Sequence, residues 1–91
     1  MLIVYSKSHC PFCVQAKKLL EMKGIDYEEI NVEQDPAKLA WLKSKGHQSV
    51  PQIYTEDDQL FVEGGFQGLV KLSDSQLKER LGEINVSNKQ V

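Results

Sequence analysis

The chain has 91 residues, a length that supports one domain, and we expect residues 1–91 to form it. Its 11 basic and 13 acidic side chains leave a formal net charge of −2, which gives no electrostatic footprint for nucleic acid or for an anionic membrane. No run of about 18 apolar residues occurs, so we expect no membrane-spanning segment and no membrane or nucleic-acid partner.

The first half of the chain predicts a strand, a helix and a second strand. Leu2–Tyr5 (LIVY) is apolar and rich in β-branched and aromatic residues, which is typical of a buried strand. This run is too short for a signal peptide, so we expect a cytoplasmic, reducing environment. Pro11 stands at a first helical position, and apolar residues at helical spacing follow up to Gly24. Residues 25–32 (IDYEEINV) then alternate apolar and polar side chains, as a strand does.

The second half predicts a helix followed by a hairpin. Asp35 before Pro36 is typical of a helix N-cap with proline at the first position, and this helix is expected to end at Gly46. Residues 52–63 (QIYTEDDQLFVE) indicate two short strands around a polar turn at residues 56–59.

The C-terminal segment predicts further helix and then a polar tail. Glycines at 64–65 break the strand pattern, and a short helix is expected from Phe66. Residues 73–76 (SDSQ) have the form of a capping box for a last helix that ends near Leu81. Residues 83–91 are mainly polar and are expected to fray beyond an ordered core of about residues 2–82.

This order of elements predicts an α/β fold with a mixed sheet. A strand–helix–strand unit implies a right-handed parallel crossover. Two strands joined by a tight turn are antiparallel. The sheet is therefore expected to combine both pairings, with helices covering it.

The stretch HCPFC contains the two cysteines of the chain, Cys10 and Cys13. A structural zinc site needs four ligands, and His47 lies on an unrelated segment, so no metal is expected. A structural disulfide between these cysteines would close a very small loop and gain little stability. A pair of inert core thiols is a further alternative.

The position of the two cysteines favours redox chemistry instead. Cys10 falls between a strand and a helix start, where unpaired N–H groups and the helix dipole favour an anionic sulfur. Cys13 follows by nearly one helical turn and faces the same side. We therefore predict thiol–disulfide exchange, in which Cys10 attacks a substrate disulfide and Cys13 resolves the mixed disulfide.

Three motifs in order make the chain resemble the glutaredoxin family of the thioredoxin-like superfamily. They are CPFC after the first strand, Val50-Pro51 before the third strand, and Gly64-Gly65 after the fourth. The resemblance covers residues 2–81. It implies a four-stranded mixed sheet flanked by helices and a cis peptide bond at Pro51.

The resemblance also implies a function. It predicts a monomeric, glutathione-dependent disulfide oxidoreductase, with glutathione as the reductant and no metal or bound nucleotide. Its substrates would be disulfide-containing or glutathionylated proteins, with ribonucleotide reductase as a family-level target.

A glutathione site follows from the same resemblance. Lys7 matches the family's lysine for the glycine carboxylate, and Lys38 stands where many members carry an Arg or Gln for that group. The backbone of Val50 would pair with the cysteinyl unit in β-fashion. Ser49 replaces the usual Thr of the motif that ends in Pro51.

The third motif departs from the family pattern. Gly65, Phe66 and Gln67 stand where glutaredoxins typically continue Gly-Gly-x-Asp, whose Asp binds the γ-glutamyl amine. Gln67 offers a carbonyl acceptor and an available backbone N–H, but the charge-assisted bond, about twice as strong as a neutral one, is lost. Phe12, a position that is often Tyr in the family, and Phe66 are candidates for an apolar rim that docks a protein substrate.

Three alternatives remain. An NrdH-like redoxin, reduced by thioredoxin reductase and serving ribonucleotide reductase, has a related turn that ends in Arg-Pro-Asp, which this chain lacks. A glutathione-dependent iron–sulfur cluster carrier usually has Cys-Gly-Phe-Ser, so Pro11 and Cys13 disfavour it. A binding module with inert cysteines would show an ordinary Cys10 reactivity towards alkylating agents.

Overall fold

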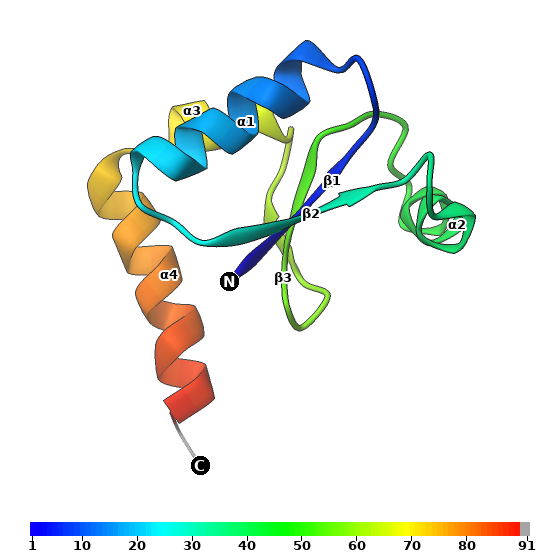
Figure 1. Cartoon of the computed structure of the whole chain (residues 1–91). Helices are drawn as coiled ribbons and strands as arrows, with labels where there is room; N and C mark the ends of the chain where they lie inside the picture. Colours follow the sequence, from blue (N-terminus) through cyan, green and yellow to red (C-terminus); the bar gives the residue numbers. More distant parts are fainter. Residues whose placement is uncertain (90–91) are drawn as a thin grey trace.

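The structure is a computed structural model that describes residues 1–89, with side chains for residues 1–82 (Figure 1). Within this range strands and helices alternate much as the sequence predicts. In chain order the elements are β1 Leu2–Ser6, α1 Pro11–Met22, β2 Tyr27–Asn31, α2 Pro36–Ser44, β3 Gln52–Thr55, β4 Leu60–Val62, α3 Phe66–Lys71 and α4 Asp74–Lys89.

The four strands form one mixed sheet in the order β2-β1-β3-β4. β1 pairs in parallel with β2 and antiparallel with β3, which in turn pairs antiparallel with β4. The predicted α/β class and mixed sheet are confirmed. Among the described residues, no helix is long and apolar enough to cross a bilayer.

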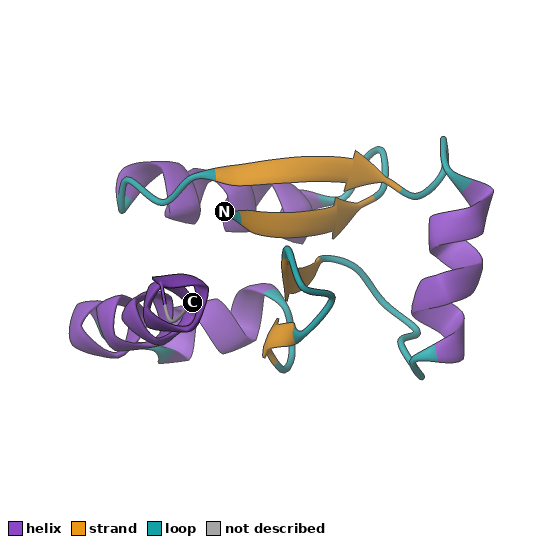
Figure 2. Ribbon diagram, turned by 90° about the horizontal axis from the view of Figure 1, so that it is seen from below, coloured by secondary structure: helices purple, strands orange, loops and turns teal. Residues whose placement is uncertain are grey.

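The two faces of the sheet carry separate apolar clusters. Leu2 and Val4 of β1 are buried in the cluster that packs α1, α3 and α4 on one face. Tyr5 points to the other face, where it packs with Leu42 of α2, because successive side chains of a strand point to opposite sides. Figure 2 shows α2 on the side opposite the other helices. Residues 7–10 connect the carboxyl end of β1 to the start of α1.

Two predicted helix starts are confirmed by their capping bonds. The side chain of Asp35 accepts a hydrogen bond from the N–H of Lys38 at 3.2 Å. The N–H of Ser73 donates to Oε1 of Gln76 at 2.9 Å, and the N–H of Gln76 donates back to Ser73 Oγ at 3.2 Å. This reciprocal pair is the capping box expected from SDSQ.

The start of β2 and the end of α4 differ from the prediction. β2 begins at Tyr27 rather than at residue 25, because the N–H of Ile25 donates to Leu20 O and extends the end of α1. The last helix was expected to end near Leu81, but α4 continues to Lys89. The segment predicted to fray contains no proline, and Gly82 alone costs a helix only about 1 kcal/mol. Residues 90–91 lie outside the described part of the chain.

Candidate active site

Cys10 caps the N-terminus of α1. Its backbone is extended, with φ −109° and ψ 102°, and Pro11 follows at the first helical position. Cys10 Sγ accepts a hydrogen bond from the N–H of Cys13 at 3.2 Å. The sulfur thus takes the place of the side-chain oxygen that usually caps a helix. This is the environment that the sequence predicted, because free N–H groups at a helix start favour negative charge on the capping atom.

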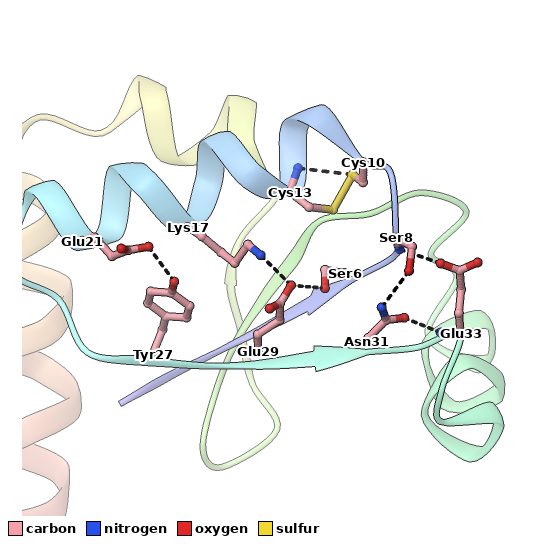
Figure 3. Close-up of polar contacts among 10 residues, drawn as sticks. All are labelled: Ser6, Ser8, Cys10, Cys13, Lys17, Glu21, Tyr27, Glu29, Asn31 and Glu33. Atoms are coloured by element: carbon pink, nitrogen blue, oxygen red, sulfur yellow. Dashed lines mark hydrogen bonds and ion pairs between the residues drawn. A yellow bond between two sulfur atoms is a disulfide. The ribbon is translucent and has the colours of Figure 1, made fainter.

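The two cysteines form a disulfide, with their Cα atoms 5.2 Å apart (Figure 3). Cys13 is buried, with 1% of its surface exposed, whereas Cys10 is partly exposed. An incoming reactant therefore reaches the sulfur of Cys10 first. This asymmetry fits an attacking Cys10 and a resolving Cys13.

The loop before β3 brings a second chain segment to Cys10. The Val50–Pro51 peptide bond is cis, as the family resemblance implied. The carbonyl oxygen of Val50 lies 3.9 Å from Cys10 Sγ. Buried Gln52 donates from Nε2 to Ser49 O at 2.8 Å and holds the loop in place. Within the described chain, no backbone hydrogen bond involves Val50, so its N–H and C=O are open to an extended peptide.

Gly65 brings a third segment to the same place. It precedes α3 with φ 57° and ψ −121°, a backbone conformation that favours glycine. A Cβ atom on Gly65 would lie 2.1 Å from the carbonyl oxygen of Pro51. Only glycine therefore lets the start of α3 pack against the cis-proline loop, and this contact places Phe66 near the cysteines.

Phe12 and Phe66, the predicted apolar rim, lie together. Their ring centroids are 6.0 Å apart and the rings are inclined by 27°. Phe12 remains 55% exposed, and Val70, one helical turn after Phe66, is 57% exposed. The prediction did not include Val70, although its spacing of four residues from Phe66 indicates the shared helix face.

One expectation at Gln67 is wrong. Its backbone N–H was expected to be available to a ligand, but it donates to the carbonyl oxygen of Gly64 at 3.2 Å. The first turn of α3 uses this group because Gly64 and Gly65 fold back before the helix. The side chain of Gln67 is exposed at this turn.

The structure separates the two lysines predicted for the glycine carboxylate. Lys7 lines a small hollow beside Ser49 and Val50, together with Lys43. Lys38 is not among its lining residues, and its Nζ lies 5.2 Å from the centroid of the Trp41 ring. The sequence reasoning missed Lys43. The sequence feature that could have indicated Lys43 is its position one helical turn after Leu39, which lines the same hollow.

A polar network on the other side of the cysteines was also missed. Glu29 on β2 accepts hydrogen bonds from Lys17 Nζ at 2.8 Å and from Ser6 Oγ at 2.6 Å (Figure 3). These bonds, with Lys17 contributing most, hold the pKa of the Glu29 carboxyl below its usual value. Among the side chains that the structure describes, no three His, Cys, Asp or Glu residues gather as metal ligands would.

Comparison with known proteins assigns this arrangement to a family. Residues 2–62 match the family model named Glutaredoxin. The chain belongs to the glutaredoxin family. It is 41% identical over 84 residues to a glutaredoxin of Pseudomonas aeruginosa, across 91% of this chain and 89% of that relative. The family membership makes the protein an oxidoreductase with a redox-active cysteine pair.

Solved structures of glutaredoxin-like proteins share the fold. The buckwheat glutaredoxin–glutathione complex matches with a TM-score of 0.71 and 30% identity, covering 90% of this chain and 76% of that one. The glutaredoxin-like NrdH-redoxin of Escherichia coli, described as having a thioredoxin-like activity profile, matches with a TM-score of 0.59 and 28% identity. That match covers 62% of this chain and 74% of the redoxin.

Proposed function

We propose that this glutaredoxin reduces protein disulfides and glutathione mixed disulfides with electrons from glutathione. One observation carries the proposal. The unpaired backbone of Val50 lies beside the accessible sulfur, with its carbonyl oxygen 3.9 Å from Cys10 Sγ. A cysteine-containing peptide that pairs with Val50 in β-fashion brings its own sulfur to Cys10. The buckwheat relative, solved in complex with glutathione, supports a peptide of this kind.

The reaction proceeds by two exchanges. The Cys10 thiolate attacks one sulfur of the target disulfide, a bond forms between them, and the second target sulfur leaves and takes up a proton. Cys13 then loses its proton and attacks Cys10 Sγ, which forms the Cys10–Cys13 disulfide and releases the other target thiol. Two electrons pass to the target. Two glutathione molecules restore the dithiol in successive exchanges and leave as glutathione disulfide.

The charges around the site support glutathione as the reductant. Lys7 and Lys43 line the hollow next to Val50, where they offer two cationic groups to a peptide carboxylate. Phe12 and Phe66 form an apolar pair that suits protein substrates. We place this chemistry in a reducing cytoplasm and propose that the protein acts as a monomer.

Gln67 favours a second candidate for the electron source. A neutral side chain at this position removes the carboxylate that family members offer to the γ-glutamyl amine. The fold match with the NrdH-redoxin of Escherichia coli, which is described as having a thioredoxin-like activity profile, supports this alternative, with thioredoxin reductase as the donor. The protein would then act as an NrdH-like redoxin that serves ribonucleotide reductase.

A coupled assay distinguishes the two donors. Consumption of NADPH is measured with glutathione plus glutathione reductase, and separately with thioredoxin reductase, at one target disulfide concentration. Turnover with glutathione is expected. Turnover with thioredoxin reductase alone would refute the proposal and establish the NrdH-like alternative.

Replacing Gln67 by Asp tests the weak point of the glutathione site. A carboxylate at this exposed turn is expected to lower the KM for glutathione several-fold, since charge-assisted hydrogen bonds are about twice as strong as neutral ones. Gln59→Asp is the matched control, because it adds the same charge to an exposed position between β3 and β4. An equal KM in both variants would show that Gln67 does not face the glutathione amine.

A further inference from the structure

A polar network joins three elements on the β2 side of the cysteine pair. Glu29 of β2 receives hydrogen bonds from Lys17 of α1 and from Ser6 at the end of β1. Ser6 is fully buried, and the Lys17 and Glu29 side chains are only 24% and 38% exposed. A pair this enclosed is screened by water less than an ordinary surface ion pair.

This network shares a hollow with both cysteines. A cavity of about 390 Å³ is lined by Cys10, Cys13, Lys17 and Glu29, among others. Lys17 follows Cys13 by four residues on α1, so the two side chains lie on one helix face about 6 Å apart. Figure 3 shows the Lys17 side chain reaching from α1 to Glu29 beneath the disulfide. The opposite side of Cys10, towards Val50, is the side that the proposed peptide occupies.

The charged groups that face Cys13 are few. Lys17 comes from α1, Glu29 from β2, and Lys7 and His9 from the loop after β1. Lys7 and His9 are exposed to solvent, whereas Lys17 is partly covered. The Lys17–Glu29 pair is therefore the partly enclosed ion pair in the hollow that Cys13 lines.

The remaining packed elements add little charge. Glu28, next to Glu29, points to the opposite face of the sheet because side chains alternate along a strand. Lys71, the single charged residue of α3, lines a separate hollow with residues of β4 and α4. Cys10 carries no charge while it is bonded to a target sulfur. Lys17 and Glu29 are thus the partly enclosed charged side chains in the hollow that Cys13 lines, in addition to the N-terminus of α1.

The second exchange makes a specific demand at Cys13. Its buried thiol must lose a proton before the sulfur can attack Cys10, and burial disfavours a thiolate. A cation one helical turn away stabilises that thiolate, and a carboxylate bound to the cation weakens its effect. The Glu29 carboxyl stays ionised at neutral pH, because Lys17 and Ser6 hold its pKa below the usual value.

We propose that Lys17 and Glu29 are opposed positioning residues for the resolving thiol. Lys17 favours the Cys13 thiolate, and Glu29 holds the Lys17 ammonium in place while offsetting part of its charge. Ser6 Oγ donates a hydrogen bond to the Glu29 carboxylate and fixes its position. This inference rests on the proposed dithiol mechanism, in which Cys13 attacks the bond between Cys10 and its target.

Two substitutions with opposite expected effects test the proposal. In a Cys10→Ser background, the rate of Cys13 alkylation by iodoacetamide is measured against pH. Lys17→Met is expected to raise the midpoint, and Glu29→Gln to lower it. Gln keeps an oxygen for Lys17 and Ser6 and removes only the charge. The shift for Lys17→Met is expected to be about 0.5–2 pH units, as Coulomb's law gives for one charge about 6 Å away at effective dielectric constants between about 80 and 20. The shift for Glu29→Gln is expected to have the opposite sign.

The second exchange is measured directly in the dithiol protein. The Cys10 mixed disulfide with a chromogenic thiol is formed, and release of that thiol by Cys13 is followed at one pH below the midpoint. A tenfold larger thiolate fraction gives about a threefold faster release, because nucleophilicity falls as the thiol becomes more acidic, with a Brønsted coefficient of about 0.4–0.5. Glu29→Gln is thus expected to speed release and Lys17→Met to slow it.

Lys23 and Asp74 form a matched control pair, since they join α1 to α4 at the far end of the helix. Lys23→Met and Asp74→Asn are expected to leave both measurements unchanged. Shifts of the same sign in Lys17→Met and Glu29→Gln, or no shift in either, would overturn the proposal and leave the network a structural tie. The alkylation profile needs no electron donor or target, so its outcome is independent of whether the proposed function holds.

Discussion

Replacing Gly65 by Ala should disrupt the meeting point of the cis-proline loop and α3. The added Cβ atom would lie 2.1 Å from the carbonyl oxygen of Pro51, which is backbone and cannot rotate away. The residue also has φ 57° with ψ −121°, a strained conformation for alanine. The perturbation thus combines a steric clash with backbone strain.

Both terms have known sizes. A residue held in a sparsely populated backbone region costs about 1–3 kcal/mol. Forcing extra volume into a packed contact costs about 1–3 kcal/mol more. The expected loss of unfolding free energy is therefore about 2–6 kcal/mol. This is a large share of the total unfolding free energy of a native domain, which is typically about 5–15 kcal/mol.

Gly24→Ala is the control that separates the two terms. Gly24 has φ +69°, but a Cβ atom there would meet nothing within 4 Å, so only the backbone cost of about 1–2 kcal/mol applies. Urea unfolding of both variants in the disulfide form gives the two free energies. Turnover should also fall in Gly65→Ala, because displacement of Pro51 moves Val50 away from Cys10. Equal stability of the two variants, with unchanged turnover, would refute the reasoning.

Three other predictions follow from the site and the fold. Cys10→Ser should abolish all exchange activity, whereas Cys13→Ser should stop protein disulfide reduction but retain deglutathionylation, which needs one thiol; parallel assays on both substrates test this. Ser73→Ala should lower the unfolding free energy by about 1 kcal/mol in urea titrations, because it removes the cap of α4. Folding lowers the pKa of the Glu29 carboxyl below its ordinary value of 4.5. The ionised carboxylate therefore stabilises the fold at pH values above 4.5, and this stabilisation is lost as the pH falls through the folded-state pKa. Glu29→Gln should thus cost up to about 1 kcal/mol at neutral pH and less in acid, as unfolding curves at several pH values would show.

The sequence predicted the features that depend on local chemistry. Pro11 after an apolar strand marked the start of α1, and therefore the capping position of Cys10. The SDSQ run marked the capping box of α4, which its two hydrogen bonds confirm. The cis bond at Pro51 came from the family resemblance, since an isolated Val-Pro pair is usually trans. Each of these signals involves residues that are close neighbours in the chain.

Features that depend on contacts between elements were harder to predict. Helical spacing showed that Lys38 and Lys43 lie on α2, but it could not show which lysine would line the same hollow as Lys7 and Val50. Likewise, Glu29 fell within a strand predicted from alternation, a pattern that names no partner for it. Its role depends on Lys17, twelve residues earlier, reaching it across the first crossover. Periodicity gives the face of an element, and tertiary packing decides its partners.

The length of α4 was missed for a different reason. Polar composition in residues 83–91 favoured a frayed tail, yet a polar segment without proline can extend a helix that is already nucleated by a capping box. Propagation costs much less than nucleation, so the cap at Ser73 influences backbone well beyond the first turn. The prediction weighed composition and neglected this cooperativity.

The active site joins chain segments that are far apart, and glycine at position 65 is the condition for this. Cys10, the Val50–Pro51 loop and the start of α3 meet because no Cβ separates Gly65 from the Pro51 carbonyl. The same contact leaves the Val50 backbone open on one side of Cys10, while the Lys17–Glu29 network occupies the other. The two proposals therefore place substrate recognition and thiol resolution on opposite sides of one disulfide. Substitutions on the network side should change the rate of the second exchange without changing which reductant the protein accepts.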